Sequence, residues 1–298
     1  MNRPLVTVIV PVYNHEKYIG SCIRSIWEQS YGAENIQLIV VEDCSPDGSR
    51  DVVIEEHEQL GFDLILNETN RGIIYNINLA LKKATGKYVC ITGSDDIWDS
   101  KKLDIQVEFM EANPQVGACS GNQMKIDSMG DPLAAEFQKK LPDATYEFKD
   151  VFLRRFFFST PLAMMRRSAL EGVGSYPPEL KVEDFYMWLK LTSSGFQMAH
   201  LESILGKYRV HEGNTNAKAV LIYEEVYKIL QEYKSHPLYK QAAKRLAVVY
   251  FPKIALLSRE RALKLLPKAV SNTRFFYRGL YYLISPGVQK RKAHALED

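Results

Sequence analysis

Two adjacent carboxylates, Asp95 and Asp96, follow an apolar run in the stretch "CITGSDDIWDS" at residues 90–100. Like charges at this spacing repel, and each raises the pKa of the other unless a cation lies near them. A solvated loop or a helix N-cap would explain the pair without any function. The alternative is a divalent cation that binds a phosphate group, because Mg²⁺ and Mn²⁺ prefer oxygen ligands.

Other polar residues stand where predicted strands end. The segments 5–13, 36–43, 62–68 and 87–93 are short, apolar and mostly β-branched, which is typical of buried strands in a parallel sheet. Ligands of such sheets bind beyond the carboxyl ends of the strands. We therefore expect one site at that edge, formed by the polar residues Tyr13, Asn14, Asp43, Asn70, Arg71, Asp95 and Asp96.

Helical patterns alternate with these strands. Apolar residues recur at helical spacing in 15–30, and helices are also predicted over 49–61 and 71–86. Strict alternation of strand and helix predicts right-handed crossovers and a doubly wound α/β sheet. Further along we predict helices over 101–113 and 183–195, a strand that enters a polar loop within 204–216, and helices in 221–234 and 239–270.

The first strand is followed by "PVYNHEKY" (11–18), which contains no glycine. A redox dinucleotide fold needs a glycine-rich turn there, so that the backbone can approach the pyrophosphate. A P-loop, GxxxxGK[ST], is also absent from the sequence. We therefore expect the sheet to hold a nucleotide by another device, such as a metal bound by Asp95 and Asp96.

The bulk composition is that of a globular protein, with 46% hydrophobic and 25% charged residues. No apolar run is long enough for a membrane-spanning helix, and the N-terminus does not resemble a signal peptide, so we expect a cytoplasmic protein. The four cysteines are scattered and suggest neither a disulfide framework nor a zinc site. From Lys218 onward the sequence contains 16 Lys and Arg but 6 Asp and Glu. This excess of positive charge favours an anionic partner for the region.

The order and spacing of several motifs resemble family 2 glycosyltransferases with the GT-A fold. These motifs are "VTVIVPVYNHEKYIGSCIRSIWEQSY", "IVVEDCSPDGS", "NRGIIYNINLALKKATGKYVCITGSDDIW", "PLAMMRRSALEGVGSYPPELKVEDFYMWLKLTSSG" and "YRVHEGNTN". The resemblance implies an inverting, metal-dependent enzyme that transfers sugar from a UDP-sugar to a hydroxyl of a cell-surface glycan. It also implies a GT-A catalytic domain at 1–217, with a nucleotide-binding half (1–100) and an acceptor-binding half (101–217), followed by a basic helical region at 218–298.

By this resemblance Asp96 coordinates Mn²⁺ or Mg²⁺, and Asp95 contacts the ribose or also reaches the metal. The family often has a further acid where this chain has Gly93, so the motif is shortened here. His211 stands where the family often places a histidine near the diphosphate and the metal. The other histidines, namely His15, His57, His200, His236 and His294, carry no such signal.

The nucleoside is expected at the other strand ends. By the resemblance Asp43 accepts a hydrogen bond from the uracil imide, and Arg71 contacts the base or a phosphate. The other residues we assign to nucleotide-sugar binding are Pro11, Tyr13, Asn14, Asn70 and Ser94. The alternatives without function are a turn-forming Asp43, a solvated Arg71 and a packing role for Tyr13.

Glu183 and Asp184 match the acidic motif that supplies the general base. We assign the base to Asp184, with Glu183 as helper or substitute. A general base must lie within hydrogen-bond reach of the acceptor hydroxyl. Both acids could instead, or in addition, complement the dipole at the start of the predicted helix.

The region after Lys218 interleaves aromatic residues with cations in "TRFFYRGLYYLISPGVQKRK". Such a pattern suits the surface of an anionic membrane, where a lipid-linked glycan acceptor would be presented. We rank a helical cap or a homo-oligomer contact ahead of this membrane role, and we expect no nucleic-acid partner. Rival functions are a catalytically silent glycan-binding subunit and a sugar nucleotidylyltransferase, although the latter needs a glycine-rich basic loop after the first strand.

Overall fold

The computed structural model describes residues 3–135, 138, 140–211, 219–270 and 273–284. The predicted polar loop after His211 and the last residues of the basic region, 285–298, lie outside this range. The chain forms two compact units that interleave along the sequence. Unit 1 comprises residues up to 148, 157–179 and 187–210, and unit 2 comprises 149–156, 180–186 and the described residues from 211 onward.

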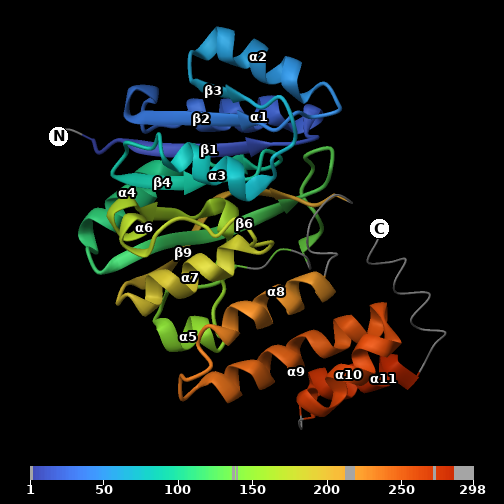
Figure 1. The fold of residues 1–298 in the computed structure, drawn as a ribbon. Helices are drawn as coiled ribbons and strands as arrows, with labels where there is room; N and C mark the ends of the chain where they lie inside the picture. The colour runs from blue at the N-terminus through green and yellow to red at the C-terminus, as the bar shows by residue number, and fades with distance from the viewer. Residues whose placement is uncertain (1–2, 136–137, 139, 212–218, 271–272, 285–298) are drawn as a thin grey trace. The chain divides into compact units, whose positions relative to one another are not determined.

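Unit 1 contains a mixed sheet whose first part is parallel (Figure 1). The parallel strands, in the order β3–β2–β1–β4, are β1 (Val6–Val12), β2 (Ile36–Glu42), β3 (Asp63–Leu66) and β4 (Tyr88–Ile91). Then follow β8 (Met164–Arg166), β6 (Val116–Ile126), β9 (Gln197–Arg209) and β5 (Ile97–Trp98), with β7 (Ala144–Tyr146) paired to β9.

The directions of the strands determine which loops meet. Strand β8 is antiparallel to both β4 and β6, and β6 is parallel to β9. Strands β1, β4 and β9 therefore run in the same direction, and their carboxyl ends lie at the same edge of the sheet. Residues far apart in the sequence are brought to that edge.

Helices cover the sheet of unit 1 on both faces. These helices include α1 (Glu16–Trp27), α2 (Ser49–Leu60), α3 (Ile73–Leu81), α4 (Lys102–Ala112) and α6 (Arg167–Val173). Alternate residues of β1, from Val6 to Val12, share a core with apolar residues of α1, α2 and α4. Helix α3 packs against β1 and β2 but adds nothing to that core, so it covers the opposite face. The predicted α/β fold with a mostly parallel sheet is confirmed.

Unit 2 is helical and has its own core. Its elements are α5 (Phe148–Phe152), the first turn of α7 (Glu183–Ser193), α8 (Ala219–Gln231), α9 (Tyr239–Leu257), α10 (Arg259–Ala269) and α11 (Arg274–Ile284). Helices α8, α10 and α11 each pack against α9 (Figure 1). A Cβ at Gly279 would lie 2.7 Å from Cε1 of Phe251, so glycine permits the close approach of α11. Among the described residues, no helix is long and apolar enough to cross a membrane.

Candidate active site

The loops that leave β1 and β2 turn sharply and are bonded to each other. Asn14 and Cys44 have φ angles of 58° and 57°, in the left-handed region that non-glycine residues rarely adopt. The N–H of Asn14 donates to Oγ of Ser45 at 3.1 Å, and the N–H of His15 donates to Oγ of Ser49 at 2.8 Å. These bonds fix the residues that follow β1, including His15, at the edge of the sheet.

Asp43 lies beside the end of β1 and is 3% exposed. Its N–H donates to the carbonyl of Val12, so the register places it next to Tyr13. Its Oδ1 accepts from the N–H of Arg71 and from Nδ2 of Asn67, both at 2.8 Å, and its Oδ2 accepts from the N–H of Gly72 at 2.9 Å. A carboxylate has about four acceptor positions. Asp43 therefore orders the loop after β3 and retains capacity for one more donor.

The predicted nucleoside residues lie around this carboxylate with much of their surface open. Tyr13 is 47% exposed, and Asn70 and Arg71 are exposed as well, while Pro11 is half-buried within β1. The guanidinium carbon of Arg71 lies 4.5 Å from the ring centroid of Tyr75, which is 42% exposed. Tyr75 was not predicted from the sequence, because an aromatic residue inside a helical pattern is usually a core residue.

Asp95 and Asp96 have different environments. Asp96 is 2% exposed, and its Oδ1 accepts from the N–H of Arg209 at 2.9 Å. Burial, together with the charge of Asp95, raises the pKa of Asp96 well above its usual range. Asp95 is half-buried, and a Cβ at position 93 would lie 2.6 Å from its Oδ1. A side chain at position 93 would therefore require the Asp95 carboxylate to move from this position.

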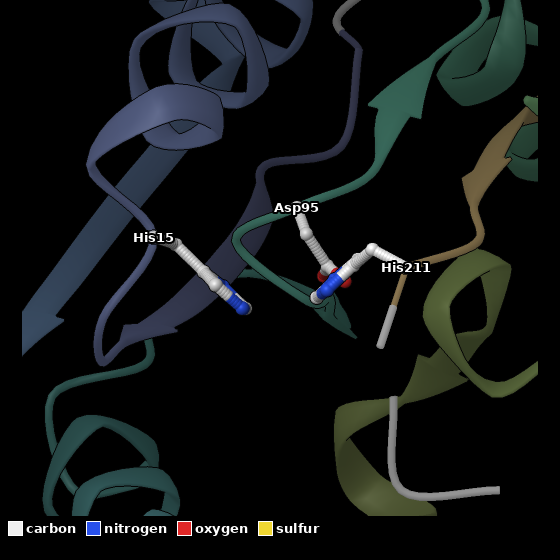
Figure 2. A group of neighbouring side chains, drawn as sticks. All are labelled: His15, Asp95 and His211. Atoms are coloured by element: carbon white, nitrogen blue, oxygen red, sulfur yellow. The ribbon is translucent and has the colours of Figure 1, made fainter. Parts of the chain in front are cut away.

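Asp95 lies in a group with two histidines, shown in Figure 2. One ligand atom from each of His15, Asp95 and His211 lies within 4.8 Å of the others. His15 follows β1, Asp95 follows β4, and His211 is the second residue after β9, so the shared edge of the sheet explains their convergence. Nδ1 of His15 lies 2.7 Å from Oγ of Ser94, and this contact orients the imidazole ring.

This donor set fits a divalent transition metal. Mn²⁺ accepts imidazole as well as carboxylate, whereas Mg²⁺ strongly prefers oxygen ligands. The two histidines therefore favour Mn²⁺ over Mg²⁺. Among the described residues Asp96, which we predicted as a metal ligand, is not part of the group, and His15, which we did not predict, is.

Arg209, at the end of β9, connects the two acids to the rest of the sheet edge. It is 4% exposed, and its Nε donates to the carbonyl of Asp95 at 2.9 Å. Its Nη1 donates at 3.2 Å to the carbonyls of Asp127 and Ser128. The guanidinium carbon lies 4.6 Å from the ring centroid of Tyr18 in α1. Arg209 therefore positions the loop after β4 and is a residue that sequence reasoning missed.

The predicted base residues lie in unit 2, at the start of α7. Both Glu183 and Asp184 are half-buried, and Oδ1 of Asp184 accepts the N–H of Phe185. Burial and the charge of Asp184 raise the pKa of Glu183 to about 7. Both acids lie in the first turn of α7, where the helix dipole favours negative charge.

Comparison with known sequences is consistent with this arrangement. The sequence profile of glycosyl transferase family 2 matches residues 7–174, more than half of the chain. The chain is 27% identical over 239 residues to the Escherichia coli protein described as UDP-Glc:alpha-D-GlcNAc-diphosphoundecaprenol beta-1,3-glucosyltransferase WfgD. That match covers 80% of this chain and 90% of WfgD.

Solved structures show the same fold. Mannosyltransferase PcManGT from Pyrobaculum calidifontis, in complex with GDP-Man and Mn²⁺, matches with a TM-score of 0.62 and 22% identity, over 98% of this chain and 88% of that chain. Residues 1–349 of S. aureus TarS in complex with UDP match with a TM-score of 0.62 and 19% identity, over 98% and 90%. The chain belongs to glycosyl transferase family 2 and is a glycosyltransferase with the GT-A fold.

Proposed function

We propose that this protein is an inverting, metal-dependent transferase that moves a sugar from a UDP-sugar to a hydroxyl of a glycan in cell-surface polysaccharide synthesis. The observation that carries the proposal is the convergence of His15, Asp95 and His211 at the edge of the sheet where Asp43 also lies. Relatives support the donor and the pathway class, since WfgD is described as a UDP-Glc transferase and AmsE of Erwinia amylovora as an amylovoran biosynthesis glycosyltransferase.

In this proposal the nucleoside lies beside Asp43, whose remaining acceptor position suits an imide N–H of the base. Arg71 and Tyr75 offer a cation and an aromatic face next to it. When bound by His15, Asp95 and His211, Mn²⁺ would neutralise the charge of the diphosphate leaving group. The buried Asp96 contributes by holding the backbone of Arg209, and thereby the loop that carries Asp95.

Asp184 acts as the general base in the proposed reaction. Its carboxylate takes the proton of the acceptor hydroxyl while the oxygen attacks the anomeric carbon of the donor sugar. The bond from that carbon to the diphosphate oxygen breaks on the opposite side, and nucleoside diphosphate leaves. A single displacement of this kind inverts the anomeric configuration.

We further propose that the acceptor is lipid-linked and that residues 218–298 meet the membrane that presents it. WfgD, as its description states, acts on a sugar diphosphate carried by undecaprenol. Helix α11 contains no acidic residue, and one of its faces is exposed and carries both aromatic side chains and arginines. Anionic lipid attracts such a surface through its cations, and the interfacial region accommodates the aromatic rings.

A donor panel tests the proposed activity. The protein is incubated with Mn²⁺ and a set of nucleotide sugars, with and without glycan acceptors, and the released nucleoside diphosphate is measured. We expect release from a UDP-sugar and loss of this release when the metal is chelated. Release of pyrophosphate would instead indicate a nucleotidylyltransferase, and no release from any donor would indicate a catalytically silent subunit.

The base assignment has its own test. Asp184→Asn is expected to lower the transfer rate about 10²- to 10⁴-fold, the range typical of general bases, while the thermal shift caused by the donor is unchanged. Glu183→Gln is the matched variant, because it neutralises the neighbouring acid. Normal transfer by Asp184→Asn together with a large loss in Glu183→Gln would move the base to Glu183.

A further inference from the structure

Unit 2 contains two cations close to one aromatic ring. The guanidinium carbon of Arg154 lies 5.6 Å from the ring centroid of Tyr250, and Nζ of Lys253 lies 5.8 Å from it. Nη2 of Arg154 also donates to the hydroxyl of Tyr250 at 3.4 Å, and its guanidinium carbon lies 5.0 Å from the ring of Phe185. Phe185 follows the proposed base Asp184, so the pair of cations lies beside the start of α7.

The charges of this cluster are unbalanced. Within the part of the chain that the structure describes, neither Arg154 nor Lys253 forms an ion pair. Partial desolvation, together with the positive charge of Arg154, lowers the pKa of Lys253, although the residue keeps an exposed surface. Burial raises the pKa of Tyr250, and the negative charge of Asp184 contributes to this rise. Two cations that face one ring repel each other, and a bound anion would relieve that repulsion.

Arg154 also has an unusual backbone conformation. It follows α5 with a φ of 51°, a region where glycine or asparagine is the common choice. Strained residues of this kind persist where the surrounding structure holds them, and they concentrate at functional sites. The turn directs an arginine toward the ring of Tyr250, where a glycine would fit the backbone more easily.

We propose that Arg154, Tyr250 and Lys253 bind a phosphate or diphosphate group of the acceptor. This proposal rests on the proposed function, because it specifies the substrate class of that reaction. An arginine fork, a lysine ammonium and a tyrosine hydroxyl are donors that suit phosphate oxygens, whereas a neutral sugar needs no pair of cations. The donor also carries a diphosphate, so the test must separate the two sources.

The test compares two acceptors that differ only in the anion. One is an alkyl GlcNAc diphosphate and the other is the matching alkyl GlcNAc glycoside, both assayed with the active donor. The variants are Arg154→Asn and Lys253→Gln. Asparagine tolerates the positive φ of position 154, so we expect Arg154→Asn to fold. Arg155→Gln is the matched control, since Arg155 is exposed and adjacent and its loss changes the net charge equally.

We expect each site variant to raise KM for the diphosphate acceptor about 10-fold or more, as the loss of a hydrogen bond to a charged group implies. KM for the glycoside and for the donor should stay at the wild-type value, and Arg155→Gln should behave as wild type with both acceptors. Equal effects on both acceptors, or no effect, would overturn the proposal. A raised donor KM would assign the anion to the donor instead and would also overturn it.

A binding measurement keeps this result separate from the proposed activity. Calorimetric titration with the alkyl GlcNAc diphosphate requires no transfer, so it remains informative if no donor proves active. Tight binding by the wild-type protein and by Arg155→Gln, with a loss of about 10-fold or more in Arg154→Asn, is the expected result. Equal affinity in all of these proteins would refute the anion site, whatever the donor panel shows.

Discussion

Glu183 is a side chain of unit 2 whose protonation changes near neutral pH. Burial and the charge of Asp184 raise its pKa from 4.5 to about 7. The folded protein therefore holds this proton more tightly than the unfolded chain does between these pH values. The stabilisation is fully present below pH 4.5 and is lost as the pH rises through 7, and it amounts to about 3 kcal/mol at most.

Glu183→Gln should remove this pH dependence, because the amide cannot ionise. We expect the variant to be more stable than the wild type at pH 8, with a difference that shrinks toward pH 5. Thermal unfolding followed by circular dichroism at several pH values measures it. Glu179→Gln is the control, since Glu179 is exposed. An equal difference in melting temperature at pH 5 and pH 8 would show that Glu183 does not titrate as stated.

Among the residues of the candidate site, the acids could be predicted from the sequence better than the residues that surround them. Asp43 ends one predicted buried strand and Asp95 follows another, so their place at the edge of the sheet could be predicted from the strand pattern. The role of His15 could not be predicted, because it depends on Ser94 and His211, which approach it only through the sheet that contains β1, β4 and β9. The opposite environments of Asp95 and Asp96 also depend on β9, which supplies the N–H of Arg209.

Strand β9 is the element that organises the candidate metal group. It ends with Arg209, at the edge where β1 and β4 also end, and His211 follows two residues later. Arg209 bonds to Asp95 and Asp96 through backbone and side chain, and also to the turn at residues 127–128. One residue thus couples the position of the loop after β4 to the strand that carries His211.

We therefore expect Arg209→Lys to weaken metal binding although the charge is kept. Lysine cannot donate in a fixed fork to several carbonyls, so the loop that carries Asp95 should lose its fixed position. Loss of such supporting contacts typically lowers metal affinity about 10- to 100-fold. Titration of Mn²⁺ by electron paramagnetic resonance measures it without any assay of transfer. Arg50→Lys is the control, because Arg50 of α2 also donates to a backbone carbonyl, that of Asn67. Equal losses in both variants would argue against a specific role of Arg209.

The elements of the first hundred residues could be predicted closely, whereas the centre of the sheet could not. Apolar β-branched runs mark β1 and β2, and they match the predicted segments within two residues. Strand β6 reads "VGACSGNQMKI", with small and polar residues that carry little strand signal. It is buried because β8 and β9 pair with it on either side, and this pairing is a property of the tertiary fold.

At the scale of the whole molecule, the basic charge after Lys218 is accompanied by an exposed apolar surface. Spacings of three and four residues place Arg274, Tyr277, Arg278, Tyr281 and Ile284 on one face of α11. All five are exposed, and the opposite face buries Gly279 and Leu283. An isolated surface tyrosine needs no explanation, but a stripe of aromatic side chains and arginines on a helix without acids favours an anionic surface.

Vesicle binding tests whether this face meets a membrane. The full chain should sediment with vesicles that contain anionic phosphatidylglycerol and not with neutral phosphatidylcholine vesicles, and added salt should weaken the binding. Each cation contributes about 1 kcal/mol near such a surface, so Arg274→Gln with Arg278→Gln should lower the affinity roughly 30-fold. Lys82→Gln with Lys83→Gln removes the same charge from exposed positions of unit 1 and should change little. The contrary result is that the α11 variant binds vesicles normally but shows a lower molecular mass by light scattering. That result would make the face a contact between copies of the chain, because a membrane contact does not determine the mass of the protein in solution.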